Sequence, residues 1–160
     1  MTKKQAYDEC YDAIVAIWGD EGGATLDDIA LMATINSVLA NRFDDYFWTG
    51  FYRVCGDRLA VGPYIGTVGC LQIEFGRGVC GTAAERRETL VVPDVNQFPG
   101  HIACDPNSKS EIVVPVFDGG GELIAVLDVD SDRINAFDDD DRAGLERIVG
   151  LFAQQVQNPA

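Results

Sequence analysis

The chain has 160 residues, of which 12 are Lys or Arg and 26 are Asp or Glu, and its formal net charge is −14 at pH 7. A surface this acidic repels phosphate backbones and anionic lipid, which argues against binding to nucleic acid and to membrane surfaces. The hydrophobic fraction of 47% supports a folded core, no apolar run is long enough to cross a bilayer, and the first residues do not resemble a signal peptide. We therefore expect one globular domain over residues 1–160 in the cytoplasm.

Helical periodicity occupies the first part of the chain. Apolar and aromatic residues recur at helical spacing between Tyr7 and Trp18, which predicts a helix over residues 3–18. After a glycine-rich break, Thr25 is the expected N-cap of a second helix. The inner face of this second helix is expected to consist of Leu26, Ile29, Ala30, Ala33 and Leu39.

From Asp44 onward, aromatic and β-branched runs separated by turns predict strands. Gly62-Pro63 is expected to end the second strand, and Asp138 is the expected N-cap of a last helix whose buried face reaches Val156. The strands are expected over residues 46–54, 58–61, 66–73, 90–92, 111–117 and 122–130, with a short helix over residues 79–87. This order predicts an α+β fold with a central antiparallel sheet flanked by helices.

The cysteine pattern argues against two classes of protein, the disulfide-rich domains and the structural zinc proteins. The cysteines are Cys10, Cys55, Cys70, Cys80 and Cys104. An odd number without a signal peptide argues against a full disulfide framework. The absence of a Cys-x-x-Cys pair, together with a single histidine, argues against a structural zinc site. The composition alone leaves buried inert thiols as the more common case and reactive thiols as the alternative.

The segment over residues 94–110 is the first candidate for a functional loop. It has no periodicity, and such a long loop inside a compact domain is usually functional or disordered. It contains Cys104, with His101 and Lys109 nearby in the sequence, and either cation would favour the thiolate. His101 as an ordinary loop residue is the competing interpretation. Cys70 and Cys80 lie upstream, either as core residues or as thiols that resolve a sulfenic acid.

Carboxylates and aromatics form the second group of candidates. Asp128 and Asp130 share one face of a predicted strand, and Glu111 opens the preceding strand. Three carboxylates near one end of a sheet are costly unless they bind a cation, share a proton or stay solvated, and a role in turns and caps is the alternative. Trp48 and Tyr52 also share a strand face, as core residues or as walls of a small pocket.

Several of these segments resemble the free methionine-(R)-sulfoxide reductases, a family of stand-alone GAF domains. The resemblance covers nearly the whole chain and is most specific between Pro99 and Pro115, together with Cys70, Cys80 and Cys104 at separations of 10 and 24 residues. The matching segments are residues 48–52, 62–64, 76–83, 91–95, 98–105, 110–115 and 127–131, together with Cys70.

The resemblance implies a GAF-like central antiparallel sheet of about six strands flanked by helices. It also implies roles: Cys104 as the nucleophile, Cys70 as the principal resolving thiol, and Cys80 as a third member of the redox set. Trp48 and Tyr52 would wall the pocket for the methyl-sulfinyl end of the substrate. Glu111, Asp128 and Asp130 would hold the substrate's amino group and polarise or protonate the S=O bond.

The implied activity is the reduction of free methionine-(R)-sulfoxide to methionine through a Cys104 sulfenic acid and an intramolecular disulfide with Cys70 or Cys80. Thioredoxin or a similar dithiol would recycle the disulfide, and neither a metal nor an organic cofactor is required. The main competing hypothesis is a GAF domain that senses a small ligand without chemistry, which leaves the cysteine triplet unexplained. The resemblance leaves open whether the chain forms a homodimer.

Overall fold

The structure is a computed structural model that describes residues 1–20, 27–101 and 104–155. Within these residues, six strands form a single antiparallel sheet in the order β3-β2-β1-β6-β5-β4. The strands are β1 (Trp48–Cys55), β2 (Arg58–Ile65), β3 (Gln72–Glu74), β4 (Leu90–Val92), β5 (Ser110–Phe117) and β6 (Leu123–Ser131). The predicted α+β class and the central antiparallel sheet are therefore confirmed.

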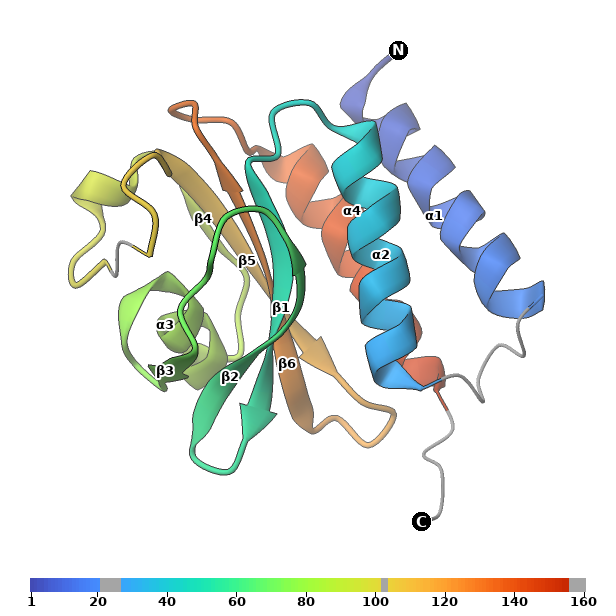
Figure 1. The fold of residues 1–160 in the computed structure, drawn as a ribbon. Helices are drawn as coiled ribbons and strands as arrows, with labels where there is room; N and C mark the ends of the chain where they lie inside the picture. Colours follow the sequence, from blue (N-terminus) through green and yellow to red (C-terminus); the bar gives the residue numbers. More distant parts are fainter. Residues whose placement is uncertain (21–26, 102–103, 156–160) are drawn as a thin grey trace.

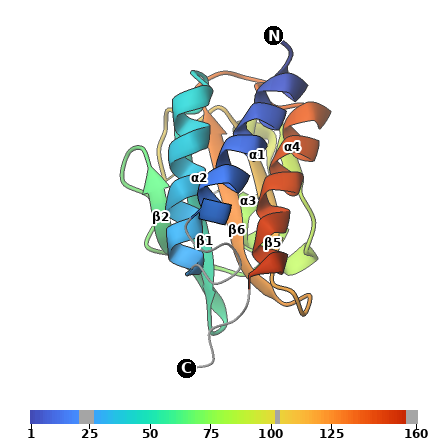
Figure 2. The ribbon, with the colours of Figure 1, turned by 90° about the vertical axis from the view of Figure 1, so that its right-hand side faces the viewer.

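Helices cover both faces of this sheet (Figure 1). On one face, α2 (Asp28–Arg42) and α4 (Asp139–Val149) pack against the strands, and α1 (Lys3–Asp20) lies over both of these helices as an outer layer (Figure 2). On the other face lies the short helix α3 (Gly78–Arg86). Two 3-10 turns, η2 (Val95–Gln97) and η3 (Gly150–Gln154), complete the described elements, and no described helix is both long and apolar enough to span a bilayer.

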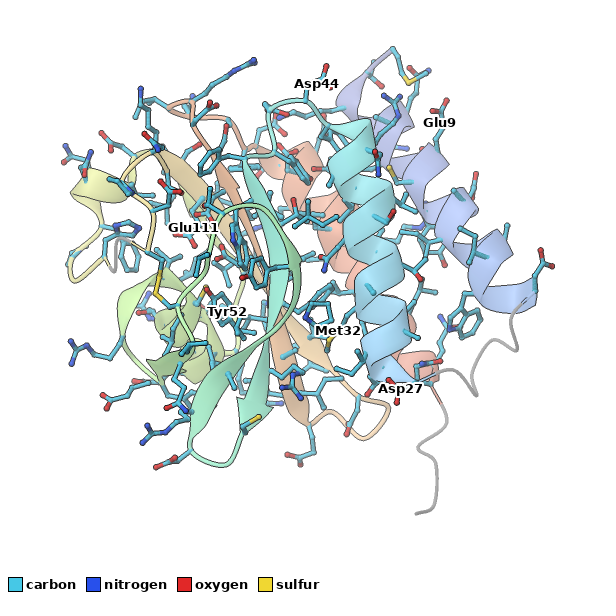
Figure 3. The ribbon with its side chains drawn as sticks, in the orientation of Figure 1. Glu9, Asp27, Met32, Asp44, Tyr52 and Glu111 are labelled. Carbon is cyan, nitrogen blue, oxygen red and sulfur yellow. A yellow bond between two sulfur atoms is a disulfide. The ribbon has the colours of Figure 1, made fainter. Side chains whose placement is uncertain are left out.

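The alternation of side chains along β6 separates the two sides of the sheet. Leu127 and Val129 join the apolar core under α1, α2 and α4, where Met32 of α2 also points toward the sheet (Figure 3). Val126 joins a second, smaller core on the side of α3. Because successive strand residues point to opposite faces, Asp128 and Asp130 lie on the α3 side with Val126. The two β6 carboxylates that the sequence predicts as functional residues therefore lie on the α3 face of the sheet.

The start of α2 differs from the sequence prediction. Asp27 is the N-cap, and its side chain accepts a hydrogen bond of 2.7 Å from the backbone N–H of Ile29. The predicted cap Thr25 and the predicted core residue Leu26 lie outside the described residues. The glycine-rich break also lies largely outside them.

The predicted inner face of α2 was wrong except at its end. Ile29 is 42% exposed and Ala30 and Ala33 are exposed, whereas Leu39 is buried as predicted. Apolar residues occur on nearly all sides of this helix, so periodicity alone does not select the face that meets the sheet. The face that is buried carries the larger side chains, which remove more apolar area from water than alanines do. It consists of Leu31, Met32, Ile35 and Leu39.

Gly62-Pro63 does not end the second strand, which continues to Ile65. Proline has no N–H to donate, and it is tolerated here because β3 pairs only with residues 58–60 of β2. The strand predicted over residues 66–73 is reduced to β3, because residues 66–71 form a loop. At the other end of the chain, Asp138 caps α4 as predicted and forms a capping box with Asp141. The predicted buried residue Val156 lies outside the described residues.

Gly144 sets the distance between α4 and α1. A Cβ atom at Gly144 would lie 2.3 Å from Cγ of Tyr7, which is buried in α1, whereas a Cβ at Gly19 of α1 would meet nothing within 4 Å. We therefore expect Gly144→Ala to lower the free energy of unfolding by roughly 2 kcal/mol, because overpacking outweighs the better helix propensity of alanine. Gly19→Ala, the matched control, should raise it by about 0.5–1 kcal/mol. Urea denaturation of both variants measures the difference, and equal effects would contradict the packing argument.

Candidate active site

The register of three strands brings the predicted carboxylates together. Asp130 of β6 pairs with Trp48 of β1 on one side and with Glu111 of β5 on the other. Asp128 follows two residues before Asp130 on the same face, opposite Gly50. The exposed fractions of Glu111, Asp128 and Asp130 are only 5%, 5% and 8%. Three carboxyl groups thus share one buried patch of the sheet, and they are not turn or cap residues.

An aromatic wall stands beside these carboxyl groups. The rings of Trp48 and Tyr52 stack with centroids 5.7 Å apart, and Tyr64 of β2 also stacks on Trp48, with centroids 5.0 Å apart. The indole fits because Gly50 lies beneath it: a Cβ there would come within 2.7 Å of Trp48 Cη2. Trp48 Nε1 donates a 2.8 Å hydrogen bond to the carbonyl oxygen of Thr67, which fixes the plane of the ring.

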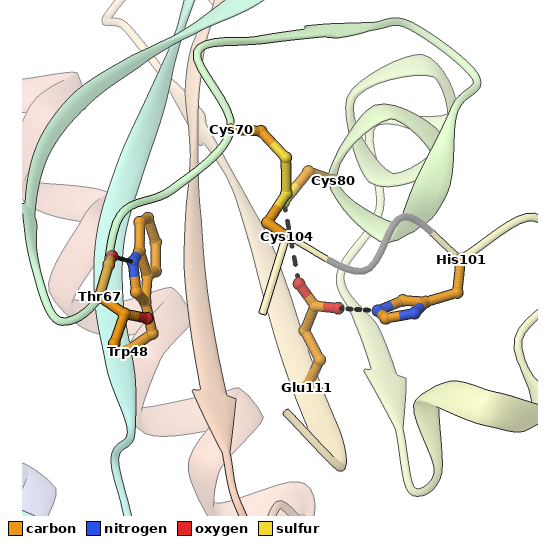
Figure 4. Close-up of a disulfide and its surroundings, with 7 residues drawn as sticks. All are labelled: Trp48, Thr67, Cys70, Cys80, His101, Cys104 and Glu111. Atoms are coloured by element: carbon orange, nitrogen blue, oxygen red, sulfur yellow. Dashed lines mark hydrogen bonds and ion pairs between the residues drawn. A yellow bond between two sulfur atoms is a disulfide. The ribbon is translucent and has the colours of Figure 1, made fainter. Parts of the chain in front are cut away.

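A disulfide between Cys70 and Cys104 closes the mouth of the site (Figure 4). It joins the loop after β2 to the loop before β5, with the two Cα atoms 5.6 Å apart. Cys104 is exposed and Cys70 is partly buried. The resemblance implied Cys70 as the principal partner of Cys104, with Cys80 as the alternative, and the structure pairs Cys104 with Cys70.

Cys80 remains a free thiol inside the site. It lies buried on α3, and its Sγ atom is 3.9 Å from Oε2 of Glu111. Burial and the neighbouring carboxylates Asp128 and Glu111 raise its pKa well above the usual value for a thiol, which keeps it protonated. Cys10 is also buried and Cys55 is exposed, and neither of them lines this site.

The site contains a link that sequence reasoning missed. The hydroxyl of Thr67 donates a 2.6 Å hydrogen bond to Oδ2 of Asp105, the residue after Cys104. Thr67 therefore contacts both the aromatic wall and the loop that carries Cys104. The two residues are 38 positions apart, and no local pattern in the sequence connects them. This hydrogen bond and the disulfide hold the same two loops together.

Burial controls the protonation of the three carboxyl groups. Desolvation raises the pKa values of Glu111 and Asp130 well above their usual range, and the charge of Asp128 raises them further. Desolvation also raises the pKa of Asp128, but hydrogen bonds with Glu111, Cys80 and Asp130 act in the opposite direction. The pKa of Asp128 is raised less than those of Glu111 and Asp130, so negative charge is more favourable on Asp128 than on the other two carboxyl groups.

Asp128 also has an unused acceptor atom. Among the described residues, its buried Oδ1 has no hydrogen-bond partner. An unpartnered buried carboxylate oxygen is costly in the folded protein and is best satisfied by a bound donor. The cluster therefore favours a ligand that carries N–H groups or a positive charge.

His101 lies elsewhere in the site than its sequence position suggested. Its Nε2 atom is 3.7 Å from Oε1 of Glu111, so the imidazole contacts a carboxyl group of the cluster. Burial lowers the pKa of His101, although the charge of Asp128 acts against this, and the neutral imidazole is favoured. The lowered pKa makes the cationic form of His101, considered in the sequence analysis as a partner for the Cys104 thiolate, less favourable.

The cavity enclosed by these elements has a volume of about 40 Å³, which is room for a few water molecules. Its walls include Trp48, Tyr52, Cys80, Cys104, Glu111 and Asp128. Donor atoms of Cys80, Glu111 and Asp128 lie within 4.8 Å of one another, the single arrangement among the described residues that has the spacing of metal ligands. The same three groups are also linked to one another by hydrogen bonds.

Comparisons with known proteins identify the class of this fold and site. A family model for the GAF domain matches residues 12–156. The chain is 42% identical over 152 residues to GAF domain-containing protein A of Dictyostelium discoideum, covering 94% of this chain and 92% of that protein. It is 43% identical over 121 residues to free methionine-R-sulfoxide reductase of Escherichia coli, covering 76% of this chain and 73% of that protein.

A solved structure gives the same answer. The structure of free methionine-R-sulfoxide reductase from Neisseria meningitidis in complex with its substrate matches with a TM-score of 0.89 and 39% identity, over 96% of this chain and 90% of that chain. A small α+β domain with a pocket on one face of its sheet, matched over residues 12–156, is a GAF domain. Among GAF domains, the chain belongs to the free methionine-R-sulfoxide reductase family, whose members are oxidoreductases.

The raised pKa of Glu111 has a consequence for stability. At pH values below the pKa of the unfolded chain, Glu111 is protonated in both states and its burial carries no ionisation cost. As pH rises from the pKa of the unfolded chain towards the raised pKa of the folded state, the unfolded chain is increasingly favoured, because it releases the proton more easily.

We therefore expect Glu111→Gln to raise the free energy of unfolding relative to the wild type, with a gain that grows from about pH 5 to pH 8 and reaches the order of 1 kcal/mol. Urea denaturation at both pH values measures it. The control is Glu122→Gln at an exposed residue of a hairpin turn, which should show no such growth. A loss of stability in Glu111→Gln at pH 8 would contradict the proposed protonation of the cluster.

Proposed function

We propose that this chain reduces free methionine-(R)-sulfoxide to methionine and that residues 1–160 act as one catalytic domain. The observation that supports this function best is the disulfide of Cys70 with the exposed Cys104 at the mouth of a pocket of buried carboxyl groups and aromatic rings. A thiol that is oxidised next to a site for a small cation is suited to reducing a zwitterionic substrate.

The first chemical step is attack by the Cys104 thiolate on the sulfur of the sulfoxide. A sulfoxide oxygen is a poor leaving group, so protons must reach it as the S–O bond breaks. Glu111 and Asp130 suit this task because burial raises their pKa values and keeps them protonated near neutral pH. The oxygen is transferred to the sulfur of Cys104 as the transient bond between Cys104 and the substrate sulfur breaks, so methionine leaves and Cys104 becomes a sulfenic acid.

The second step closes the disulfide. The Cys70 thiol attacks the sulfenic acid of Cys104, water leaves, and the S–S bond forms. An external dithiol, thioredoxin or a similar protein, then returns both cysteines to thiols and is itself oxidised to a disulfide. Cys80, a protonated thiol beside Glu111, completes the redox set as a further thiol within the site. No metal or organic cofactor takes part in the cycle.

Substrate recognition follows from the charge distribution of the pocket. The ammonium group of a free amino acid supplies the N–H donors and positive charge that the carboxylate of Asp128 lacks. Trp48 and Tyr52 form the apolar surface for the methyl-sulfinyl end. A methionine sulfoxide within a peptide has no free ammonium, and we infer that the site selects the free amino acid for this reason.

The central test of the proposed function is the loss of the nucleophile. We expect Cys104→Ser to lower turnover of methionine-(R)-sulfoxide to the background level. The hydroxyl of serine is a much weaker nucleophile than a thiolate and forms no sulfenic acid. Methionine formation in the presence of dithiothreitol measures it. Cys10→Ser and Cys55→Ser are the controls and should keep nearly full activity.

Thiol titration then distinguishes an enzyme from a sensor. One equivalent of the (R)-sulfoxide added to the reduced wild type should remove two thiols per chain and release one methionine. An unchanged thiol count, or full activity in Cys104→Ser, would refute the proposed mechanism.

The proposed role of Asp128 makes a prediction about substrate form. Acetylation of the amino group removes the positive charge, and we expect N-acetyl-methionine-(R)-sulfoxide to have a kcat/KM lower by a factor of 100 or more, since a buried charge would lose its partner. Steady-state kinetics with both substrates measure the ratio. In Asp128→Asn the ratio should shrink markedly, because the charge that distinguishes the two substrates is gone. Equal kcat/KM values in the wild type would contradict the assignment.

A further inference from the structure

We propose that Val68 and Leu71 form the docking surface on which a protein dithiol binds in order to reduce the Cys70–Cys104 disulfide. The inference rests on the proposed function, because it locates the reductant of that catalytic cycle on the surface of the chain. It concerns two side chains that have no role in the chemistry described above.

The two side chains stand out by their exposure. Val68 is 81% exposed and Leu71 is 76% exposed, and among the large apolar residues of the described chain only Met1, at 80%, is comparable. Ile65, at 43%, lies in the same stretch. Exposed apolar residues that cluster at one place typically mark a binding surface, whereas scattered ones carry no meaning. This cluster lies within five residues of Cys70 in the sequence.

The loop that carries these side chains is held in place at several points. The carbonyl oxygen of Leu71 accepts a 3.0 Å hydrogen bond from the backbone N–H of Val61. The carbonyl and hydroxyl of Thr67 are bonded to Trp48 and Asp105, and Cys70 is held by the disulfide. The exposure of Val68 and Leu71 is thus built into a fixed loop, although burying a leucine side chain would be favourable.

The chemistry of the neighbouring disulfide identifies the partner. In the exchange, a thiolate of the partner attacks one sulfur, a mixed disulfide forms, and the other cysteine leaves as a thiolate. The second thiol of the partner then attacks the mixed disulfide, so the partner ends oxidised and Cys70 and Cys104 end as two thiols. A small thiol needs no surface for this reaction, but a protein must hold its thiolate against an accessible sulfur, and Cys104 is exposed.

The charge of the chain favours apolar contact at this site. A net charge of −14 provides no long-range attraction for a neutral or acidic partner. Asp105, beside Cys104, adds a local negative charge, since its hydrogen bonds with Thr67 and Asn107 lower its pKa. The affinity for such a partner must then come from the short-range burial of Val68 and Leu71 against apolar residues around the partner's thiols.

The test separates docking from chemistry by using two reductants. The variant is Leu71→Ser, and the matched control is Ile29→Ser, an apolar side chain exposed on α2 at the opposite face of the sheet. We expect Leu71→Ser to lower kcat/KM for thioredoxin at least about fivefold, mainly through KM, and to keep its dithiothreitol-supported turnover. Ile29→Ser should keep both activities.

A second measurement needs no sulfoxide at all. The oxidised protein is mixed with reduced thioredoxin or with dithiothreitol, and the loss of the disulfide is followed by acid quenching and thiol labelling. Val68→Ser, whose side chain also reaches the rim of the cavity, is compared with Leu71→Ser in this assay. Both variants should slow reduction by thioredoxin and leave reduction by dithiothreitol unchanged, which also shows that they are folded.

The outcomes distinguish this inference from the proposed function. Unchanged thioredoxin rates in both variants, or a wild-type disulfide that only dithiothreitol reduces, would overturn the docking surface while the reductase activity stands. Wild-type protein that forms no methionine with either reductant would overturn the proposed function, and the disulfide reduction rates would still decide the docking surface.

Discussion

Three carboxyl groups buried on one face of the sheet impose the constraint on which the rest of this structure depends. Glu111, Asp128 and Asp130 are brought together by the pairing of β6 with β5, and the pairing with β1 sets Trp48 beside them. Removing them from water is costly, so protons and hydrogen bonds must replace the lost solvation. The protein meets this cost by keeping protons on the cluster and by concentrating negative charge on Asp128.

The burial that makes these carboxyl groups costly also suits them to the proposed reaction. In the proposed function, carboxyl groups with raised pKa values serve as proton donors, and the unpartnered oxygen of Asp128 accepts a hydrogen bond from the substrate's ammonium group. A more stable arrangement, with amides or apolar residues in these positions, would lose both properties. The buried carboxyl groups therefore lower the stability of the protein locally, and the large apolar core on the other side of the sheet compensates for this loss.

The oxidised pair of cysteines joins the two loops that lie over the pocket. The Cys70–Cys104 disulfide and the Thr67–Asp105 hydrogen bond tie the same two loops together over a cavity of about 40 Å³. In the proposed cycle, a reductant that acts on the exposed Cys104 would release the covalent tie between these loops.

Local patterns in the sequence were sufficient to predict several features of the fold and of the candidate site. The strand alternation placed Asp128 and Asp130 on one face, the aspartate run placed the cap of α4 at Asp138, and the motifs indicated the family. These features depend on residues within a few positions of one another, where backbone geometry and hydrogen bonding act directly.

Only the tertiary structure decided the features that join distant segments. It chose Cys70 over Cys80 as the partner of Cys104, placed His101 against Glu111, and connected Thr67 with Asp105. It also turned the large side chains of α2 toward the sheet in place of the alanines. Each of these contacts is chosen by packing among elements far apart in the chain. Periodicity and spacing record only which face a residue occupies, so the sequence by itself determined the chemical groups, and the fold determined which of them meet.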